Sequence, residues 1–247
     1  MAGQGGALQP RLTRAFFARP VLQVAPDLLG CTVLHSGVTL RLTEVEAYDG
    51  TNDPGSHAFR GRTPRTAVMF GEPGGLYVYF AYGMHWCANL VCGPSGAASA
   101  VLLRAGEVIG GLDPARSRRA GVTDRDLARG PARLAMALAL SGDQNGVDTV
   151  ATDSPLVMRE PASPHRSDER DQGPVTADGP GWTGSVPDPP RLTPQIVGTG
   201  PRVGVSGLGG DAAVYPWRFW LEGEATVSAY RPGKARPPKP AKHPDDP

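Results

Sequence analysis

The stretch LYVYFAYGMHWCANLVC, residues 76–92, carries the pattern from which the fold is predicted. Side chains of two kinds alternate through it, except at residues 82–85, and this alternation predicts two antiparallel strands joined as a hairpin. With Met84 at the centre of the turn, Phe80 would pair with Ala88 and Tyr79 with Asn89. One face is then apolar and is expected to meet the core: Leu76, Val78, Phe80, Ala88 and Leu90. The other face carries Tyr77, Tyr79, Asn89 and Val91.

The hairpin also holds a large share of the aromatic residues. Five of the sixteen Phe, Trp and Tyr residues of the chain lie between residues 76 and 86. Tyr82 stands beside the turn glycine at the expected tip, where it can project outward. A bulky aromatic residue at a hairpin tip is either a lid on the core or a wedge that inserts into a partner, and the pattern leaves both interpretations open.

The segments around the hairpin predict further strands and short helices. Residues 12–30 favour short helices, residues 31–48 two strands joined at Ser36-Gly37, and residues 99–108 another strand. GPARLAMALALSG (130–142) is the clearest helix, with Pro131 in its first turn and Gly142 at its end. PRVGVSGLGG (201–210) and WRFWLEGEATVSAY (217–230) have strand-like composition. The pattern predicts a mixed α/β (α+β) fold: a single domain with a curved antiparallel β-sheet core flanked by helices and a protruding β-hairpin.

Composition sets the expected boundaries of that domain. Gly and Pro number 33 and 26, which favours many turns and loops. We expect a disordered lead at 1–11, a folded domain at 12–231, and a disordered tail at 232–247. Residues 160–200 are rich in Pro, Gly, Ser, Asp and Arg, and are expected to form a flexible insert within the domain.

The charge and the polar residues exclude several classes of protein. The net charge is only +1, but the segment from His57 to Arg133 contains ten Arg and only five acidic residues. This local excess of positive charge is compatible with DNA binding or with a solvated surface. No segment has the apolar character of a signal sequence or a membrane span, so a cytoplasmic protein without a membrane partner is expected. The three Cys residues form no C-x-x-C pair, and no His begins an H-x-E motif. This excludes a zinc deaminase and predicts no metal site and no cofactor.

Candidate catalytic carboxylates lie in TEVEAYDGTNDPGSH, residues 43–57. If no bulge intervenes, Glu44, Glu46 and Tyr48 continue the apolar face that Leu40 and Leu42 begin. A carboxylate on such a face is desolvated, and this favours acid–base competence. An exposed strand end with solvated carboxylates is the alternative, and the alternation does not choose between Glu44 and Glu46.

Several blocks in a fixed order strongly resemble the alkyladenine (3-methyladenine) DNA glycosylase family. They are EVEAY (44–48), His57, RTPRTAVMF (62–70), LYVYFAYGMHWCAN (76–89), VLLRAGE (101–107), GPARLAMALAL (130–140), RVGV (202–205) and PWRFW (216–220). The likeness covers roughly residues 12–158 and 195–230. It implies that 12–231 is a DNA glycosylase domain that flips damaged purines, alkylated or deaminated, out of double-stranded DNA and hydrolyses their N-glycosidic bond in base excision repair.

The resemblance also implies roles for individual residues. Glu46 falls at the water-activating general base, and Arg104 at a position that orients the water and the backbone. Four residues fall at the base pocket: Tyr48, His57, Tyr79 and Asn89. Tyr82, with Met84 at the same tip, falls at the intercalating surface. His85 departs from the family, which more usually has an aromatic residue there.

The chemistry of the residues supports the function that the resemblance implies. Stacking of a base on an aromatic ring is worth about 1–3 kcal/mol, comparable to the few kcal/mol that flipping costs. Arg60, Arg62 and Arg65 could hold phosphates.

The only lysines, Lys234, Lys239 and Lys242, lie in the tail, so no amine is expected to form a Schiff base, and a monofunctional enzyme that leaves an abasic site is predicted. We expect a monomer. A nucleoside or carbohydrate hydrolase and a non-catalytic DNA-binding module remain the alternatives.

Overall fold

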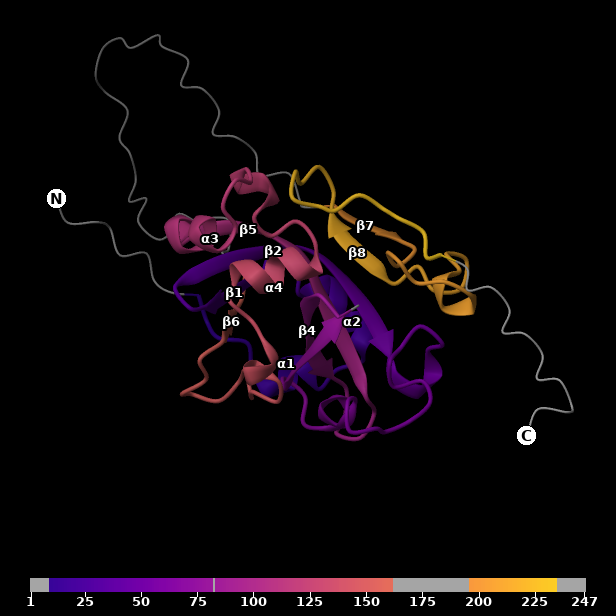
Figure 1. Cartoon of the computed structure of the whole chain (residues 1–247). Helices are drawn as coiled ribbons and strands as arrows, with labels where there is room; N and C mark the ends of the chain where they lie inside the picture. The colour runs from indigo at the N-terminus through magenta and orange to yellow at the C-terminus, as the bar shows by residue number, and fades with distance from the viewer. Residues whose placement is uncertain (1–8, 82, 162–195, 235–247) are drawn as a thin grey trace, which may run out of the picture.

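The computed structural model describes residues 9–81, 83–161 and 196–234. These residues form one eight-stranded antiparallel sheet that is not closed into a barrel, with short helices packed against it (Figure 1). The strand order is β3-β4-β5-β2-β1-β6, and β8 joins β2 and β7. The long strand β2 is central, because β5 pairs along one edge while β1 and then β8 pair along the other. The predicted mixed α/β fold is confirmed.

The elements follow the expected order. The strands are β1 (Thr32–His35), β2 (Val38–Asp49), β3 (Leu76–Ala81), β4 (His85–Cys92), β5 (Ser99–Gly110), β6 (Val157–Arg159), β7 (Val197–Gly200) and β8 (Arg218–Leu221). The α-helices are α1 (Arg14–Phe17), α2 (Val21–Asp27), α3 (Leu112–Arg118) and α4 (Pro131–Ala137). Five 3₁₀ turns complete the described part: η1 (Gly50–Asn52), η2 (Ala67–Phe70), η3 (Asp124–Asp126), η4 (Gly142–Gln144) and η5 (Leu208–Gly210).

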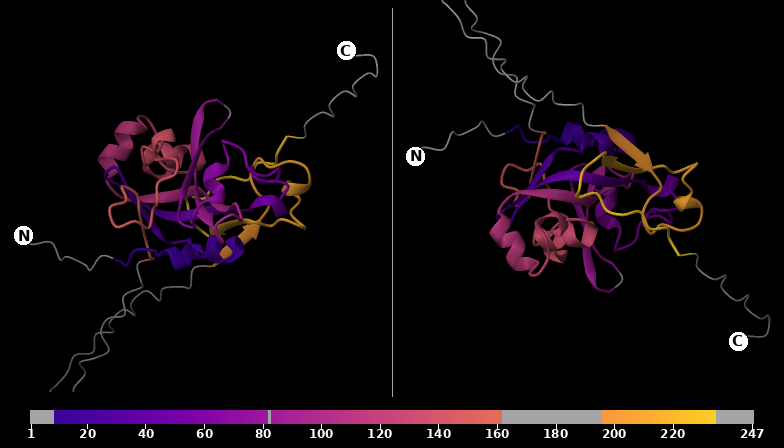
Figure 2. Two further views of the ribbon diagram at one scale, coloured as in Figure 1. Left: turned by 90° about the horizontal axis from the view of Figure 1, so that it is seen from below. Right: turned by 90° about the horizontal axis from the view of Figure 1, so that it is seen from above.

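The β3–β4 hairpin forms as predicted, and Figure 2 shows it projecting beyond the rest of the sheet. Its predicted register is wrong by two residues, because Tyr79 pairs with Cys87 and Tyr77 with Asn89. The turn is centred on Gly83, which has a φ of +67° that a residue with a side chain rarely adopts. The amide of Met84 donates to the carbonyl of Ala81 and closes this shorter turn.

The two faces of the hairpin pack against two different hydrophobic clusters. Leu76, Val78, Ala88 and Leu90 belong to the larger cluster, with α2 and α4, as predicted. Tyr77 and Val91 belong to a smaller cluster on the opposite face, beneath the segment 58–70. Phe80 is not a core residue, because it lies near the end of the projecting strand, where 46 % of it is exposed and its ring packs on Trp86.

A break in the ladder of β2 overturns the predicted continuation of its apolar face. The pairing with β5 shifts between Leu42 and Glu44 and again between Glu44 and Val45. Leu42 and Val45 therefore both face the large cluster, although they are three residues apart. Because a bulge changes the alternation of side chains, Glu44 and Glu46 leave the core face and lie on the opposite side.

The predicted helix 130–142 is shorter than its apolar pattern indicates. It begins at Pro131 as expected but ends at Ala137, and Ala139 adopts a positive φ of 53°. Gly142 is therefore not its C-terminal glycine. A Cβ at Gly142 would lie 2.9 Å from Cη2 of Trp86, so the absence of a side chain there lets η4 pack directly under the hairpin.

The expected boundaries fit the structure only in part. Residues 162–195, most of the predicted insert, lie outside the described residues, as do 1–8 and 235–247. At its end the insert prediction is wrong, because Val197–Gly200 form β7. PRVGVSGLGG is a loop with one 3₁₀ turn rather than a strand, whereas β8 lies within the predicted segment 217–230. No helix of the described residues has the length and apolar composition needed to cross a membrane.

Candidate active site

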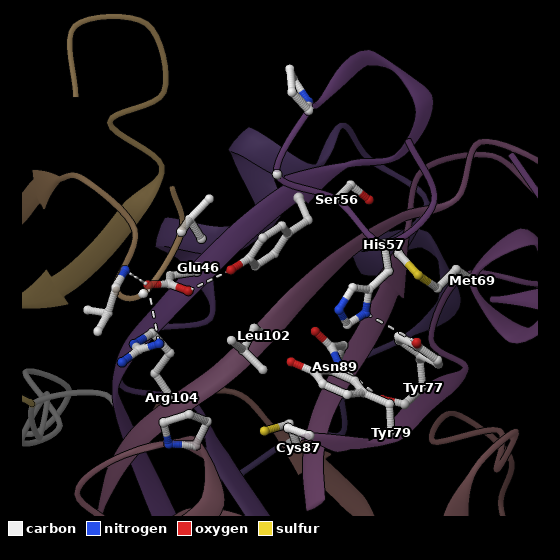
Figure 3. A pocket seen from close by; sticks show the side chains of 18 of the residues that line it. Glu46, Ser56, His57, Met69, Tyr77, Tyr79, Cys87, Asn89, Leu102 and Arg104 are labelled. Carbon is white, nitrogen blue, oxygen red and sulfur yellow. Dashed lines mark hydrogen bonds and ion pairs between the residues drawn. The ribbon is translucent and has the colours of Figure 1, made fainter. Parts of the chain in front are cut away.

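A cavity of about 400 Å³ opens between β2, the hairpin and two loops (Figure 3). Its size lies within the range of about 300–1,000 Å³ typical of small-molecule sites. β2 contributes Glu46 and Tyr48, and the pocket face of β3, β4 and β5 contributes Tyr79, Asn89 and Arg104. Residues 54–57 form one rim and Val203–Ser206 another. The bulge in β2 is what turns Glu46 toward this cavity.

Glu46 is fully buried, and hydrogen-bond donors reach both of its carboxylate oxygens. The backbone N–H of Val203 donates to Oε1 at 2.7 Å, and the hydroxyl of Tyr48 donates to Oε2 at 2.9 Å. A nitrogen of the Arg104 guanidinium lies 3.3 Å from Oε1. These contacts fix the orientation of both carboxylate oxygens. Burial, and then the charge of Glu46, raise the pKa of Tyr48 well above its ordinary value of 10.0, so its hydroxyl keeps the proton that it donates.

Glu44 is equally buried but does not line the cavity. Arg104 and Arg218 donate to its Oε1 at 2.7 and 2.8 Å, and the Ser228 amide donates to Oε2 at 2.7 Å. Burial alone would raise the pKa of Glu44, but the two guanidinium groups and this amide lower it below its ordinary value. Glu44 therefore fixes Arg104 beside Glu46, and only Glu46 faces the cavity.

Aromatic rings form the wall opposite Glu46 and Arg104 (Figure 3). Tyr77 and Tyr79 stack with their ring centroids 5.5 Å apart, and His57 meets Tyr79 edge-on at 4.6 Å. The hydroxyl of Tyr77 lies 3.3 Å from Nδ1 of His57. Although His57 is exposed, the protein atoms around its ring, and then the charge of Arg65, lower its pKa to about 4. His57 is therefore neutral at pH 7.

Asn89 lies on this side of the cavity, and Arg65 lies over the ring of Tyr79. Asn89 is buried, and its Nδ2 donates to the Tyr77 carbonyl at 3.1 Å, which fixes the amide in the pocket wall. The Arg65 guanidinium lies 5.3 Å from the centroid of the Tyr79 ring. Arg60, Arg62 and Arg65 are all exposed, in the segment that follows His57. The structure thus brings together every predicted catalytic and pocket residue.

The structure describes only one of the two predicted intercalating residues. Tyr82 lies outside the described residues. Met84, on the other side of the turn glycine, is 66 % exposed at the tip of the hairpin. The tip therefore presents an apolar side chain to solvent, apart from any contribution of Tyr82.

A second cavity, of about 460 Å³, adjoins the first through Arg104 and Val203. Its other charged lining residues are Asp126, Arg129, Arg133 and Arg231. Arg129 lies 3.5 Å from Asp126 and donates to the Val227 carbonyl. Within the described part of the chain, the guanidinium groups of Arg133 and Arg231 make no hydrogen bond or ion pair, so this cavity has an excess of positive charge.

Three residues of the site were missed from the sequence. Val203 acts through its backbone N–H, which any residue but proline possesses. Arg202 and Asp53 form a fully buried ion pair behind Tyr48. Arg202 belongs to the RVGV block, which contributes to the family resemblance but carried no predicted role for Arg202. Among the described residues, no cluster of His, Cys, Asp and Glu is placed to hold a metal ion.

Comparison with known proteins identifies close relatives. A family model described as methylpurine-DNA glycosylase matches residues 15–225. A protein of Streptomyces avermitilis is 52 % identical over 225 residues, which cover 89 % of this chain and 92 % of the relative. A protein of Frankia casuarinae is 50 % identical, over 88 % of this chain and 92 % of its own length. A protein of Leifsonia xyli is 46 % identical with the same coverage. All three carry 3-methyladenine DNA glycosylase as a provisional name.

Proposed function

The chain belongs to the methylpurine-DNA glycosylase family and is a DNA-repair hydrolase of the N-glycosyl bond, and we propose that it acts on damaged purines flipped from duplex DNA into the Glu46 cavity. The observation that carries this proposal is Glu46 itself: a buried carboxylate that faces an aromatic-walled cavity, with donors on both oxygens. A base within a duplex cannot be reached, so an enzyme that acts on it must extrude it into such a pocket.

Glu46 is suited to the chemistry of glycosidic cleavage. The bond breaks through a sugar with oxocarbenium character, and a fixed carboxylate can stabilise that positive charge while it orients the attacking water. Arg104 would help to orient that water. Burial alone would lower the pKa of Arg104, but Glu46 and Glu44 raise it above its ordinary value, so its charge is permanent. The proton of the water passes to Glu46 and the hydroxyl adds to the sugar carbon, while the electron pair of the N-glycosyl bond leaves with the base. A cationic alkylpurine then departs as a neutral molecule, whereas a neutral base such as hypoxanthine must accept a proton from a general acid or a water chain as it leaves.

The walls of the cavity are suited to a flat base. Tyr48 and Tyr79 lie on different strands, and a ring between them would gain about 1–3 kcal/mol from stacking. A neutral His57 and the fixed amide of Asn89 can make hydrogen bonds to the edge of the base, and Asn89 is our candidate for discrimination against guanine. The preference for alkylated or deaminated purines rests on these contacts.

We propose that the product is an intact abasic site. A glycosylase that also cleaves the strand needs an amine to form a Schiff base with the sugar. No lysine lies among the described residues that line the cavity, and Lys234 is the only lysine within the described part of the chain. A monomeric enzyme that acts in the cytoplasm stays a prediction.

Glu46→Gln is the decisive test. With a duplex that carries one hypoxanthine, this variant should lose base release almost completely, while it still binds an abasic-site duplex. The wild-type enzyme should release the base, leave the strand uncut and yield no adduct with borohydride, and free inosine should be inert. If Glu46→Gln stays fully active while Glu44→Gln loses activity, the general base has been assigned to the wrong carboxylate. Turnover of free nucleosides would refute the proposal that the substrate is a base flipped from duplex DNA.

A further inference from the structure

A buried ion pair behind the cavity wall has no role in the reaction as proposed above. The side chains of Arg202 and Asp53 are both fully buried, and Nη2 of Arg202 donates to Oδ1 of Asp53 at 2.7 Å. Arg202 also donates to the carbonyl of Ala47 at 3.0 Å and to that of Gly209 at 2.6 Å. One guanidinium group therefore joins the end of β2, the loop that follows β2, and the loop 201–210.

Both of the neutral hydrogen-bond donors to Glu46 are positioned next to this ion pair. Val203, whose N–H binds Oε1, is the next residue in the chain after Arg202. Tyr48, whose hydroxyl binds Oε2, has its ring centroid 4.5 Å from the Arg202 guanidinium carbon. A displacement of Arg202 would therefore move the donors to both carboxylate oxygens at once.

The contact between the two loops is too close for side chains. A Cβ at Gly209 would lie 2.4 Å from the backbone nitrogen of Gly55, and a Cβ at Gly55 would lie 2.4 Å from Nη2 of Arg202. The loops thus meet backbone to backbone, with Arg202 enclosed between them. This arrangement gives Val203 a fixed position relative to β2.

We propose that the Arg202–Asp53 pair is a positioning device for the carboxylate of Glu46, an inference that rests on the proposed role of Glu46 as general base. Neither residue lines the cavity, so both act through Val203 and Tyr48. A buried ion pair is often no more stabilising than apolar residues of the same size. Its directional bonds instead hold the donors where the ionised carboxylate needs them, and a misplacement of about 1 Å can cost a reaction about 100-fold in rate.

The test uses Arg202→Lys, which keeps the charge but loses the planar fork, and the milder Asp53→Asn. Base release from the hypoxanthine duplex is measured in single turnover with saturating enzyme. We expect the rate to fall by about 100-fold for Arg202→Lys, while binding of an abasic-site duplex changes little. Combined with Glu46→Gln, Arg202→Lys should cause no further loss, because both changes act on the same step.

The comparison of rate with binding separates positioning from a general loss of stability. At saturating enzyme the single-turnover rate reports on molecules that are folded and hold the duplex, so a loss of folded protein alone leaves it unchanged. Arg202→Lys and Asp53→Asn should both lower this rate while the affinity for an abasic-site duplex stays near that of the wild type, because the displaced donors belong to Glu46.

Leu138→Ala is the control, because it opens a cavity in the large core cluster without touching the site. The proposal is refuted if the two variants lose no more rate than Leu138→Ala, or if Arg202→Lys lowers the rate of Glu46→Gln further. If Glu46→Gln is inactive while the Arg202 and Asp53 variants resemble the wild type, only the positioning role fails. If Glu46→Gln is active, the proposed function fails.

Discussion

Glu44 and Glu46 lie two residues apart on one strand and are both fully buried, yet they are suited to different tasks. Glu44 accepts hydrogen bonds from Arg104, Arg218 and Ser228, which leaves no part of it facing the cavity. Glu46 has fewer donors and lines the cavity. The difference lies in what surrounds each carboxylate, so Glu44 should support the site through stability and Glu46 through chemistry.

Replacement of Glu44 by Gln should destabilise the protein. It leaves the guanidinium groups of Arg104 and Arg218 buried without their anion, and the loss of one partner from a buried pair costs about 3–5 kcal/mol. Urea unfolding at pH 7 measures this free energy. Asp124→Asn is the control, because its ion pair with Arg116 is exposed and should contribute hardly anything.

The same variant should alter the dependence of stability on pH. The folded-state pKa of Glu44 is depressed below its ordinary value of 4.5, so its stabilisation is present above pH 4.5 and is lost as the pH falls through the lower, folded-state value. In Glu44→Gln that part of the acid-induced loss should disappear. Parallel unfolding curves below pH 4.5 for wild type and variant would contradict the assigned ion pairs.

A functional residue could be predicted from the sequence where the pattern that marks it is local. Glu46, Tyr48 and His57 are close in sequence and carry recognisable chemistry, and the structure places all three around one cavity. The general-base role rests on the resemblance, since alternation left Glu44 and Glu46 open. Arg202 and Asp53 are 149 residues apart, and no local pattern announces an ion pair across such a distance.

At the scale of elements, irregularities are what the sequence pattern could not supply. The strands β1 to β5 and β8 were predicted because alternation is a local property, whereas the short strands β6 and β7 were not predicted and the expected strand at 201–210 is a loop. The bulge that turns Glu46 to the cavity depends on the pairing of β2 with β5, and the register of the hairpin depends on the conformation of Gly83. The predicted face of β2 depended on the condition that no bulge intervenes, and the predicted register of the hairpin depended on a turn centred on Met84. Alternation alone fixes neither the bulge nor the centre of the turn.

The projecting hairpin should act as the element that keeps a base flipped. Tyr82→Ala and Met84→Ala remove the two side chains predicted to intercalate. Each variant should weaken binding to a lesion duplex and lower the flipped population, measured by the fluorescence of 2-aminopurine beside the lesion. Insertion of an apolar wedge offsets the unstacking cost of a few kcal/mol.

Phe80→Ala is the control for this experiment, since it loosens the packing on Trp86 without changing the tip. The hairpin is confirmed as a wedge if the tip variants reduce flipping more than Phe80→Ala does. Unchanged activity of Tyr82→Ala across lesions would instead favour the interpretation of Tyr82 as a lid on the core.

At the scale of the whole molecule, the positive charge near the cavity lies in two places although the net charge of the chain is only +1. Arg60 and Arg62 are exposed in the segment that follows His57, while Arg133 and Arg231 line the second cavity beyond Arg104. Figure 3 places Arg104 and the aromatic wall on opposite sides of the cavity. A DNA backbone crossing the mouth of the cavity would meet positive charge on both sides of the flipped nucleotide.

This arrangement predicts a salt dependence of binding that can be divided between the two sides. Each phosphate contact contributes about 0.9 to the slope of log affinity against log salt concentration. The double variants Arg60→Gln/Arg62→Gln and Arg133→Gln/Arg231→Gln should each reduce the slope for an abasic-site duplex by about 1.8. Arg14→Gln/Arg19→Gln removes the same charge from half-exposed ion pairs that do not line the cavity and should leave the slope unchanged. Equal effects of all three variants would mean that DNA responds to overall charge, and an effect confined to one side of the cavity would show that the backbone path does not cross it.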